Sequence, residues 1–125
     1  MKDSPLCILD TNIVLYLLGG KLAQPLPENF VYAVSFITEM ELLSYPNLDE
    51  NSEREINEFL SDILVLDLTK EIKIQAISLR QKYNIKLPDA IISATAVTNT
   101  ATLLSNDKKL KTIIELKPET LALLD

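Results

Sequence analysis

Four apolar residues in a row, Leu6 to Leu9, are followed directly by three polar ones, Asp10-Thr11-Asn12, and then by the apolar spacing of a helix. A strand without polar positions is typical of the centre of a parallel sheet, where both faces are covered. The pattern therefore places Asp10 where a central strand ends and a helix begins. Ligands bind at that edge of open α/β sheets. On this segment alone, a helix cap is the better interpretation, because Asp, Thr and Asn are all favoured as caps.

Alternating strand and helix patterns continue along the rest of the sequence. Beyond the first strand, further strands are expected at residues 30–35, 64–68, 102–105 and 113–116. Helical segments are expected at residues 12–18, 37–45, 52–63, 70–83, 87–98 and 108–112. The third helix would open with a capping box at Ser52-Glu53-Arg54-Glu55, and Thr69 would cap the fourth. This alternation predicts a parallel sheet covered on both faces, and residues 1–125 are interpreted as a single domain.

The composition excludes several classes of active site. The 125 residues include no histidine and one cysteine, so imidazole catalysis, His-ligated metals and thiolate zinc clusters are excluded. Cys7 lies in the first apolar run and is expected to be a small buried side chain, which fits a reducing environment. No apolar run is long enough to span a bilayer, and the first residues lack a signal-peptide pattern. We therefore expect a cytoplasmic protein without a membrane partner.

The net charge of −6 argues against general attraction to nucleic acid, but the charges are separated along the chain. Seven acidic residues and one basic residue, Arg54, lie between residues 49 and 67. Eight basic and three acidic residues lie between residues 70 and 111. The second segment could meet a polyanion, although solvated helix faces account for most of these charges.

Four carboxylates interrupt or end apolar patterns rather than lying on polar faces. Asp10 ends the first strand, and Asp107 follows the fourth predicted strand. Glu41 lies at the margin of a buried helical stripe, and Asp89 opens a nearly uncharged helix. Each also has a local explanation as a cap, a turn residue or a solvent-facing helix position. Two strand ends and two helices packed on one sheet could nevertheless direct all four into one cleft.

Such a cluster needs a positive ion. Two like charges about 4 Å apart repel by about 4 kcal/mol at an effective dielectric constant near 20. Carboxylate ligands without His or Cys select a hard divalent cation, Mg²⁺ or Mn²⁺ before Zn²⁺. Such an ion can activate a water and neutralise a phosphate, which favours cleavage of a nucleic-acid backbone.

The sequence resembles the PIN-domain ribonucleases, and among them the VapC toxins of VapBC toxin–antitoxin pairs. The resemblance covers nearly the whole chain, and its four segments follow the family's order and spacing. They are Ile8-Leu9-Asp10-Thr11-Asn12, Ser35-Phe36-Ile37-Thr38-Glu39-Met40-Glu41-Leu42, Leu87-Pro88-Asp89-Ala90-Ile91-Ile92-Ser93-Ala94-Thr95-Ala96 and Leu104-Ser105-Asn106-Asp107. The resemblance implies a three-layer α/β/α sandwich with a five-stranded parallel sheet, and Mg²⁺- or Mn²⁺-dependent cleavage of RNA.

The resemblance also implies roles for individual residues. The catalytic, metal-binding positions are matched by Asp10, Glu41, Asp89 and Asp107. The polar neighbours that would orient them are Thr11, Asn12, Ser105 and Asn106. The lysines nearest to the motifs, as candidates for RNA contacts, are Lys86, Lys108 and Lys109.

One departure and two further expectations follow from the same resemblance. Many relatives carry another acid and an aromatic residue where this chain has Lys109 and Leu110, which weakens the case for a second metal position. Toxins of this family form homodimers. A small antitoxin inhibits them by inserting its tail into the acidic site. A homodimer and an antitoxin partner are therefore expected here.

Two alternatives remain open at this point. In a phosphoacceptor receiver domain, Asp67 would be phosphorylated, Asp10 would bind the metal, Ser105 would supply a hydroxyl, and Lys117-Pro118 would form the lysine turn. Receiver domains usually place two adjacent acids after the first strand, whereas this chain has Asp10-Thr11. The other alternative is a catalytically silent PIN-like module that only binds partners, against which the four intact acids argue.

Overall fold

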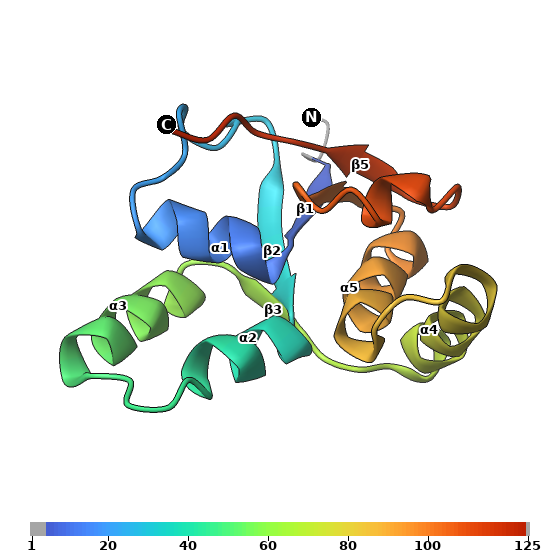
Figure 1. The fold of residues 1–125 in the computed structure, drawn as a ribbon, viewed down its shortest axis with the longest axis horizontal. Helices are drawn as coiled ribbons and strands as arrows, with labels where there is room; N and C mark the ends of the chain where they lie inside the picture. Colours follow the sequence, from blue (N-terminus) through green and yellow to red (C-terminus); the bar gives the residue numbers. More distant parts are fainter. Residues whose placement is uncertain (1–4, 125) are drawn as a thin grey trace.

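Within residues 5–124, which the computed structural model describes, five short parallel strands form one sheet (Figure 1). The strands are β1 (Leu6–Leu9), β2 (Val31–Ser35), β3 (Leu64–Leu66), β4 (Thr102–Leu104) and β5 (Lys117–Glu119). Their spatial order is β3-β2-β1-β4-β5, so the apolar β1 is central, as the sequence predicts. The fold is the expected α/β sandwich with a five-stranded parallel sheet.

Helices follow or precede the strands in the predicted order. They are α1 (Thr11–Leu18), α2 (Phe36–Leu43), α3 (Glu50–Ser61), α4 (Lys70–Tyr83) and α5 (Leu87–Thr98), with a 3₁₀ turn, η1, at Leu110–Thr112. Pro88 lies in the first turn of α5, where its missing N–H removes no helical hydrogen bond. None of the helices within residues 5–124 combines the length and hydrophobicity that crossing a bilayer requires.

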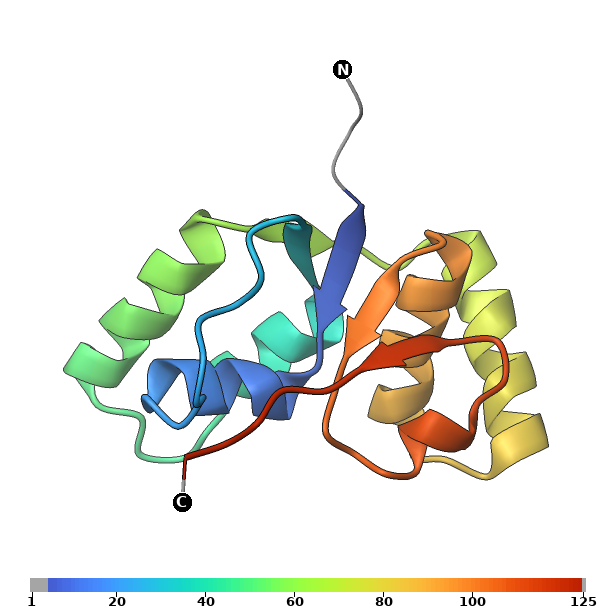
Figure 2. The same cartoon turned by 90° about the horizontal axis from the view of Figure 1, so that it is seen from above.

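Side chains of successive strand residues enter two separate cores. Ile8 of β1 packs with residues of α4 and α5, whereas Cys7 and Leu9 pack with residues of α1, α2 and α3. Figures 1 and 2 show the two helical layers on opposite sides of the sheet. Burial raises the pKa of the Cys7 thiol to about 12, so this cysteine is a neutral core residue, as expected. Alternation along β1 therefore sets which helices cover each face.

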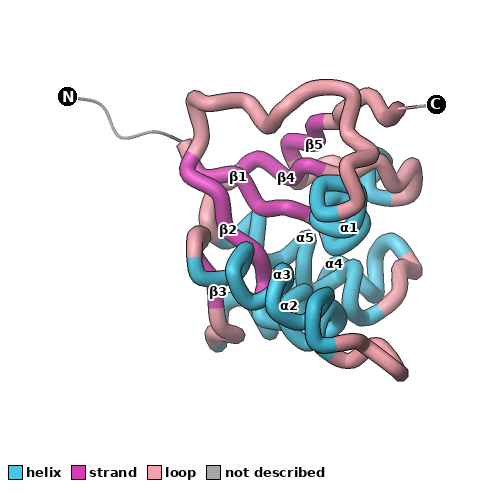
Figure 3. The backbone as a smooth tube through the Cα atoms, turned by 90° about the vertical axis from the view of Figure 1, so that its left-hand side faces the viewer, coloured by secondary structure: helices cyan, strands magenta, loops and turns pink. Residues whose placement is uncertain are grey.

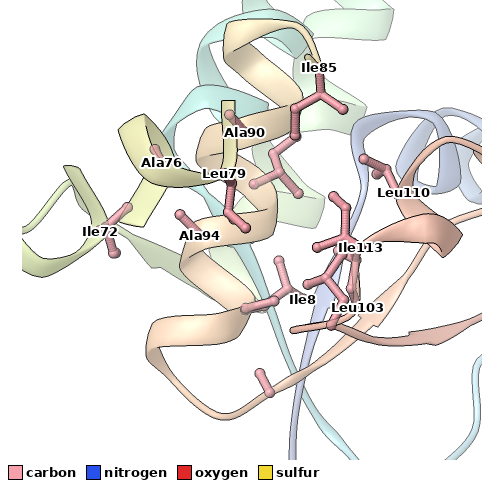
Figure 4. Close-up of a cluster of buried hydrophobic side chains, with 14 of the residues drawn as sticks. Ile8, Ile72, Ala76, Leu79, Ile85, Ala90, Ala94, Leu103, Leu110 and Ile113 are labelled. Carbon is pink, nitrogen blue, oxygen red and sulfur yellow. The ribbon is translucent and has the colours of Figure 1, made fainter. Parts of the chain in front are cut away.

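Small residues on α5 let this helix lie close to the sheet. Ala90 and Ala94 are fully buried one turn apart, and they face Ile8, Leu79 and Leu103 in the larger core (Figure 4). Fully burying one large aliphatic side chain contributes about 1.5–3 kcal/mol to stability. Close packing here holds the N-terminal turn of α5 in place beside the end of β1.

Two local predictions are wrong. The fifth strand is not at residues 113–116, which form a turn. Ile113 and Leu116 of this turn are buried in the core, and Ile114 is 84% exposed. The strand is β5, whose three residues are exposed and carry no apolar pattern. In addition, α3 begins at Glu50 rather than after Ser52. Its cap is Asp49, whose carboxylate accepts a 2.7 Å hydrogen bond from the Ser52 N–H.

The carboxyl ends of β1 and β4 lie side by side (Figure 3). Leu9 pairs with Leu104, and the Asp10 N–H donates to the Leu104 carbonyl at 3.0 Å, which extends the ladder by one residue. From β1 the chain runs to β2 and β3 on one side, and it returns through β4 to β5 on the other. α/β proteins bind ligands at the carboxyl edge of the sheet where the strand order reverses in this way.

Candidate active site

Asp10 is the buried acid at the centre of this edge. It follows β1, is 6% exposed, and caps α1 by accepting a 2.8 Å hydrogen bond from the Thr11 N–H on Oδ1. Its Oδ2 accepts a 2.7 Å hydrogen bond from the hydroxyl of Ser105, which follows β4. The cap interpretation is therefore correct, and it is compatible with a site. Each carboxylate oxygen keeps a free lone pair.

A chain of hydroxyls connects the start of α1 to Glu41 on α2. The Thr11 hydroxyl donates to Glu41 Oε1 at 2.8 Å and lies 2.9 Å from the Thr38 hydroxyl. Because Thr11 has one hydroxyl proton and gives it to Glu41, Thr38 must be the donor to Thr11. Glu41 is thus oriented toward the start of α1, whereas Glu39 makes no side-chain hydrogen bond among the described residues.

Thr38 belongs to this network although sequence reasoning assigned it no role. It is fully buried and lies three residues before Glu41, so the two side chains share a helix face. In the sequence, the spacing of this threonine and glutamate at the margin of an apolar stripe is the feature that could have indicated a role for Thr38.

Ser105 also holds the turn that carries Asp107. The Ser105 hydroxyl accepts a hydrogen bond from the Asp107 N–H at 3.1 Å while donating to Asp10. Asp107 Oδ1 in turn accepts from the Lys109 N–H at 2.9 Å, which closes the turn before η1. The turn interpretation of Asp107 is therefore also correct, and the turn lies beside Asp10.

Asp89, in the first turn of α5, is the fourth member. Burial raises the pKa of Asp89, and the charges of Asp10, Asp107 and Glu41 raise it further, while Lys86 lowers it in part. Burial also raises the pKa of Asp10, where the hydrogen bonds from Ser105 and Thr11 oppose the shift and Asp107 and Glu41 add to it. Four acids from four elements therefore share one electrostatic field.

The side chains of the remaining predicted residues make no hydrogen bond to the four acids among the described residues. Asn12 is exposed on α1. The Asn106 amide bonds to the backbone of Leu121 in both directions, at 3.0 and 3.2 Å, so it fastens the C-terminal segment. The three predicted RNA-contacting lysines are exposed near the acids, with Lys86 before α5 and Lys108 and Lys109 after Asp107.

The donor set fits a hard divalent cation. The four carboxylates have no ammonium or guanidinium partner, since the ion pair found within residues 5–124 joins Lys82 to Glu115. Among these residues, no three side chains of the metal-binding types enclose a common point as they stand. The four like charges repel one another, and hydroxyl groups hold Asp10 and Glu41 in their present orientations. Binding an ion therefore requires the carboxylates to turn inward, and within residues 5–124 no basic side chain forms an ion pair with them.

The receiver alternative does not match this arrangement. Asp67 is exposed after β3, which is separated from β1 by β2. Lys117 and Pro118 lie within β5 and not in a turn. Receiver domains also have the strand order 2-1-3-4-5, which differs from the order observed here.

Comparisons with known proteins agree on one family. The PIN domain family model matches residues 7–116. No curated protein matches the chain significantly. The chain is similar to VapBC2 from Rickettsia felis, solved bound to a promoter DNA fragment, with 25% identity over 94% of this chain and 99% of that one and a TM-score of 0.81.

Two further solved structures are similar over most of their length. A toxin–antitoxin complex from Klebsiella pneumoniae has 31% identity, covering 88% of this chain and 94% of that one, with a TM-score of 0.72. VapBC-1 from nontypeable Haemophilus influenzae has 26% identity, covering 92% and 97%, with a TM-score of 0.73.

Proposed function

This chain belongs to the PIN-domain family and is a VapC-type member of it, and we propose that it is a Mg²⁺- or Mn²⁺-dependent endoribonuclease, the toxin of a toxin–antitoxin pair. It would act as a single cytoplasmic domain. The observation that carries this proposal is the group of four carboxylates without an ion-pair partner near the carboxyl ends of β1 and β4.

Each acid has a separate part in the proposed site. Asp10 and Asp89 would bind the ion, because burial and the charges of the neighbouring acids both raise their pKa values, and a cation would relieve both effects. Glu41 and Asp107 would complete the ligand set from opposite sides. When bound, the metal would supply an activated water and neutralise the phosphate to be cleaved.

Hydroxyl groups would orient the ligands. Ser105 holds Asp10 Oδ2, and Thr11 holds Glu41 Oε1, so Glu41 Oε2 remains available to an ion or to its waters. Hydrogen bonds of this kind fix the direction of a ligating carboxylate and typically change metal affinity 10–100-fold. No side chain is needed as the nucleophile, which agrees with the absence of histidine from the sequence.

The RNA backbone would approach along exposed lysines. Lys86 lies before Asp89, and Lys108 and Lys109 follow Asp107, so positive charges flank the acidic site from two elements. They would hold the phosphates on either side of the bond to be cleaved and offset the repulsion between RNA and an acidic protein.

We further propose an antitoxin partner and a homodimer. The solved relatives include toxin–antitoxin complexes, which supports the first. For the second, Ile74 and Ile77 of α4 and Leu87 of α5 are each more than half exposed, although all are large and apolar. Glu71 lies at the start of α4 and Arg80 near its end. Antiparallel contact of two α4 helices would therefore join the apolar side chains and pair opposite charges.

Incubation of the purified protein with RNA tests the enzymatic proposal. We expect cleavage with Mn²⁺ and none with excess chelator. The Asp10→Asn variant, purified in parallel, controls for contaminating ribonucleases and should be inactive. Equal cleavage in chelator would refute the metal mechanism. A protein that cleaves no RNA with Mn²⁺ would instead be a silent PIN-like module.

A further inference from the structure

Ser93 of α5 has a buried hydroxyl that the proposed mechanism does not use. The residue is fully buried, and Ser93 Oγ is the one buried side-chain polar atom within residues 5–124 that has no hydrogen-bond partner. An unpaired buried hydroxyl is unfavourable and uncommon, so its presence calls for a physical reason.

The expected local partner is not used. A serine or threonine inside a helix usually satisfies its hydroxyl by donating to the carbonyl four residues earlier. Thr95, two residues further along α5, does this with the Ile91 carbonyl at 2.7 Å. Ser93 does not, although the helix is the same and the backbone is regular.

Ser93 lies one turn after Asp89. Residues four apart share a helix face, and helical side chains incline toward the N-terminus. The Ser93 side chain therefore lies on the same helix face as Asp89, one turn away. The hydrogen bonds found within residues 5–124 give a hydroxyl donor to Asp10, from Ser105, and to Glu41, from Thr11, but none to Asp89. Asp107 also has no hydroxyl donor there, but its Oδ1 accepts a hydrogen bond from the Lys109 N–H. Asp89 has no such bond among the described residues, and the hydroxyl without an acceptor lies one turn away on the same helix.

We propose that Ser93 is the positioning residue of Asp89, whose carboxylate accepts a hydrogen bond from the Ser93 hydroxyl when a divalent cation draws it into the site. This inference rests on the proposed metal-dependent function. Each of three acids would then have one hydroxyl donor: Ser105 for Asp10, Thr11 for Glu41, and Ser93 for Asp89. Two of these bonds exist without the ion, and the third forms with it.

The proposal predicts opposite effects of one substitution. Ser93→Ala removes an unpaired buried hydroxyl, so the metal-free protein should unfold at an equal or higher urea concentration than wild type. The same change removes the donor to Asp89, so Mn²⁺ affinity, measured by calorimetry or by the electron paramagnetic resonance of free Mn²⁺, should fall about tenfold. A residue that merely packs would lower the urea midpoint and leave Mn²⁺ affinity unchanged.

Three further variants complete the test. Ser93→Cys keeps a weaker donor and should give an intermediate affinity. Thr95→Val, on the same helix, should leave Mn²⁺ affinity unchanged, because the Thr95 hydroxyl is already bonded to the backbone. In an Asp89→Asn background, Ser93→Ala should have no further effect on Mn²⁺ affinity, since Ser93 acts through Asp89.

The outcomes separate this inference from the function on which it rests. If the wild-type protein binds no Mn²⁺, the proposed function fails, and the inference fails with it. If wild type binds Mn²⁺ and Ser93→Ala binds equally well, or if the loss persists in full in the Asp89→Asn background, the role of Ser93 is refuted while the metal site stands.

Discussion

The hydroxyl of Ser105 donates a 2.7 Å hydrogen bond to Oδ2 of Asp10, a residue 95 positions earlier in the chain. This bond joins the carboxyl ends of β1 and β4 at the point where the strand order reverses. It also stabilises the charged form of Asp10, because it opposes the rise in pKa that burial causes. The hydrogen bond therefore offsets part of the cost of burying this acid at the sheet edge.

Ser105→Ala should destabilise the protein by about 1–3 kcal/mol, because a buried charged group loses a hydrogen-bond donor. It should also raise the pKa of Asp10 further above its ordinary value. Urea unfolding in the presence of chelator measures the first effect, and carboxyl titration by NMR measures the second. Ser61→Ala is the matched control, since Ser61 is exposed and bonds to the Glu58 carbonyl. Equal midpoints for the two variants would contradict this role of Ser105.

Asp89→Asn should abolish RNA cleavage and also stabilise the metal-free fold. The substitution removes a half-buried charge that lies in the repulsive field of Asp10, Asp107 and Glu41. Because removing one charge of a repelling pair relieves an interaction of a few kcal/mol at most, we expect a gain of about 1 kcal/mol. Thermal unfolding in chelator is the measurement, with exposed Asp67→Asn as the control that should change neither stability nor cleavage. A lower melting temperature for Asp89→Asn would mean that the Asp89 carboxylate stabilises the fold and is not destabilised by repulsion from the neighbouring acids.

The stability of the metal-free protein should respond to pH through Asp10 and Asp89. Both have a folded-state pKa above the ordinary value of 3.8, so the folded protein binds these protons more tightly than the unfolded chain. Their favourable contribution is complete below pH 3.8 and is lost as the pH rises through the raised values. Glu115 acts in the opposite direction, because its hydrogen bond from Tyr83 lowers its pKa. We therefore predict the sign of one difference, the free energy of unfolding of Asp89→Asn minus that of wild type. It should be positive and should grow between acidic and neutral pH. If this difference in stability does not depend on pH, the pKa of Asp89 is not raised in the folded protein.

Thr38→Val should reduce RNA cleavage with little loss of stability. The change keeps the shape of a fully buried side chain but removes the donor that holds the Thr11 hydroxyl on Glu41. We expect about a tenfold fall in kcat, as for other groups that orient a metal ligand. Thr38→Ser keeps the hydroxyl and should retain most of the activity. If Thr38→Val cleaves RNA at the wild-type rate, Thr38 does not orient Glu41 through Thr11.

Ile77→Glu should convert the proposed homodimer into a monomer. The side chain is 54% exposed beside Leu87, so a charge there can be solvated in the free chain but not in an apolar contact between two α4 helices. Sedimentation at several concentrations is the measurement. Leu124→Glu is the control, because Leu124 is 55% exposed and lies outside α4 and α5. A wild-type protein that sediments as a monomer, or an unchanged dimer after Ile77→Glu, would exclude this face as the interface.

Local patterns predicted most of the secondary structure because they act over a few residues. The all-apolar β1, the Thr69 cap of α4 and the first-turn Pro88 of α5 are signals of this kind, and the structure confirms all three. The same signals directed attention to Asp10, Asp89 and Asp107, because each ends or opens an element. The fifth strand was misplaced since β5 is defined by backbone pairing of Thr102 with Lys117 and not by burial of its side chains.

The sequence by itself determined the order of elements and the parallel sheet, and it singled out the four acids as the proposed ligands, because periodicity, caps and turn residues are properties of short segments. Only the tertiary structure decided which hydroxyl serves which acid: Ser105 for Asp10, and Thr38 and Thr11 for Glu41. It also assigned Asn106 to the C-terminal segment and left the Ser93 hydroxyl buried without a partner. Hydrogen bonds between residues 27 to 95 positions apart depend on how strands and helices assemble, and no pattern within a single segment encodes them.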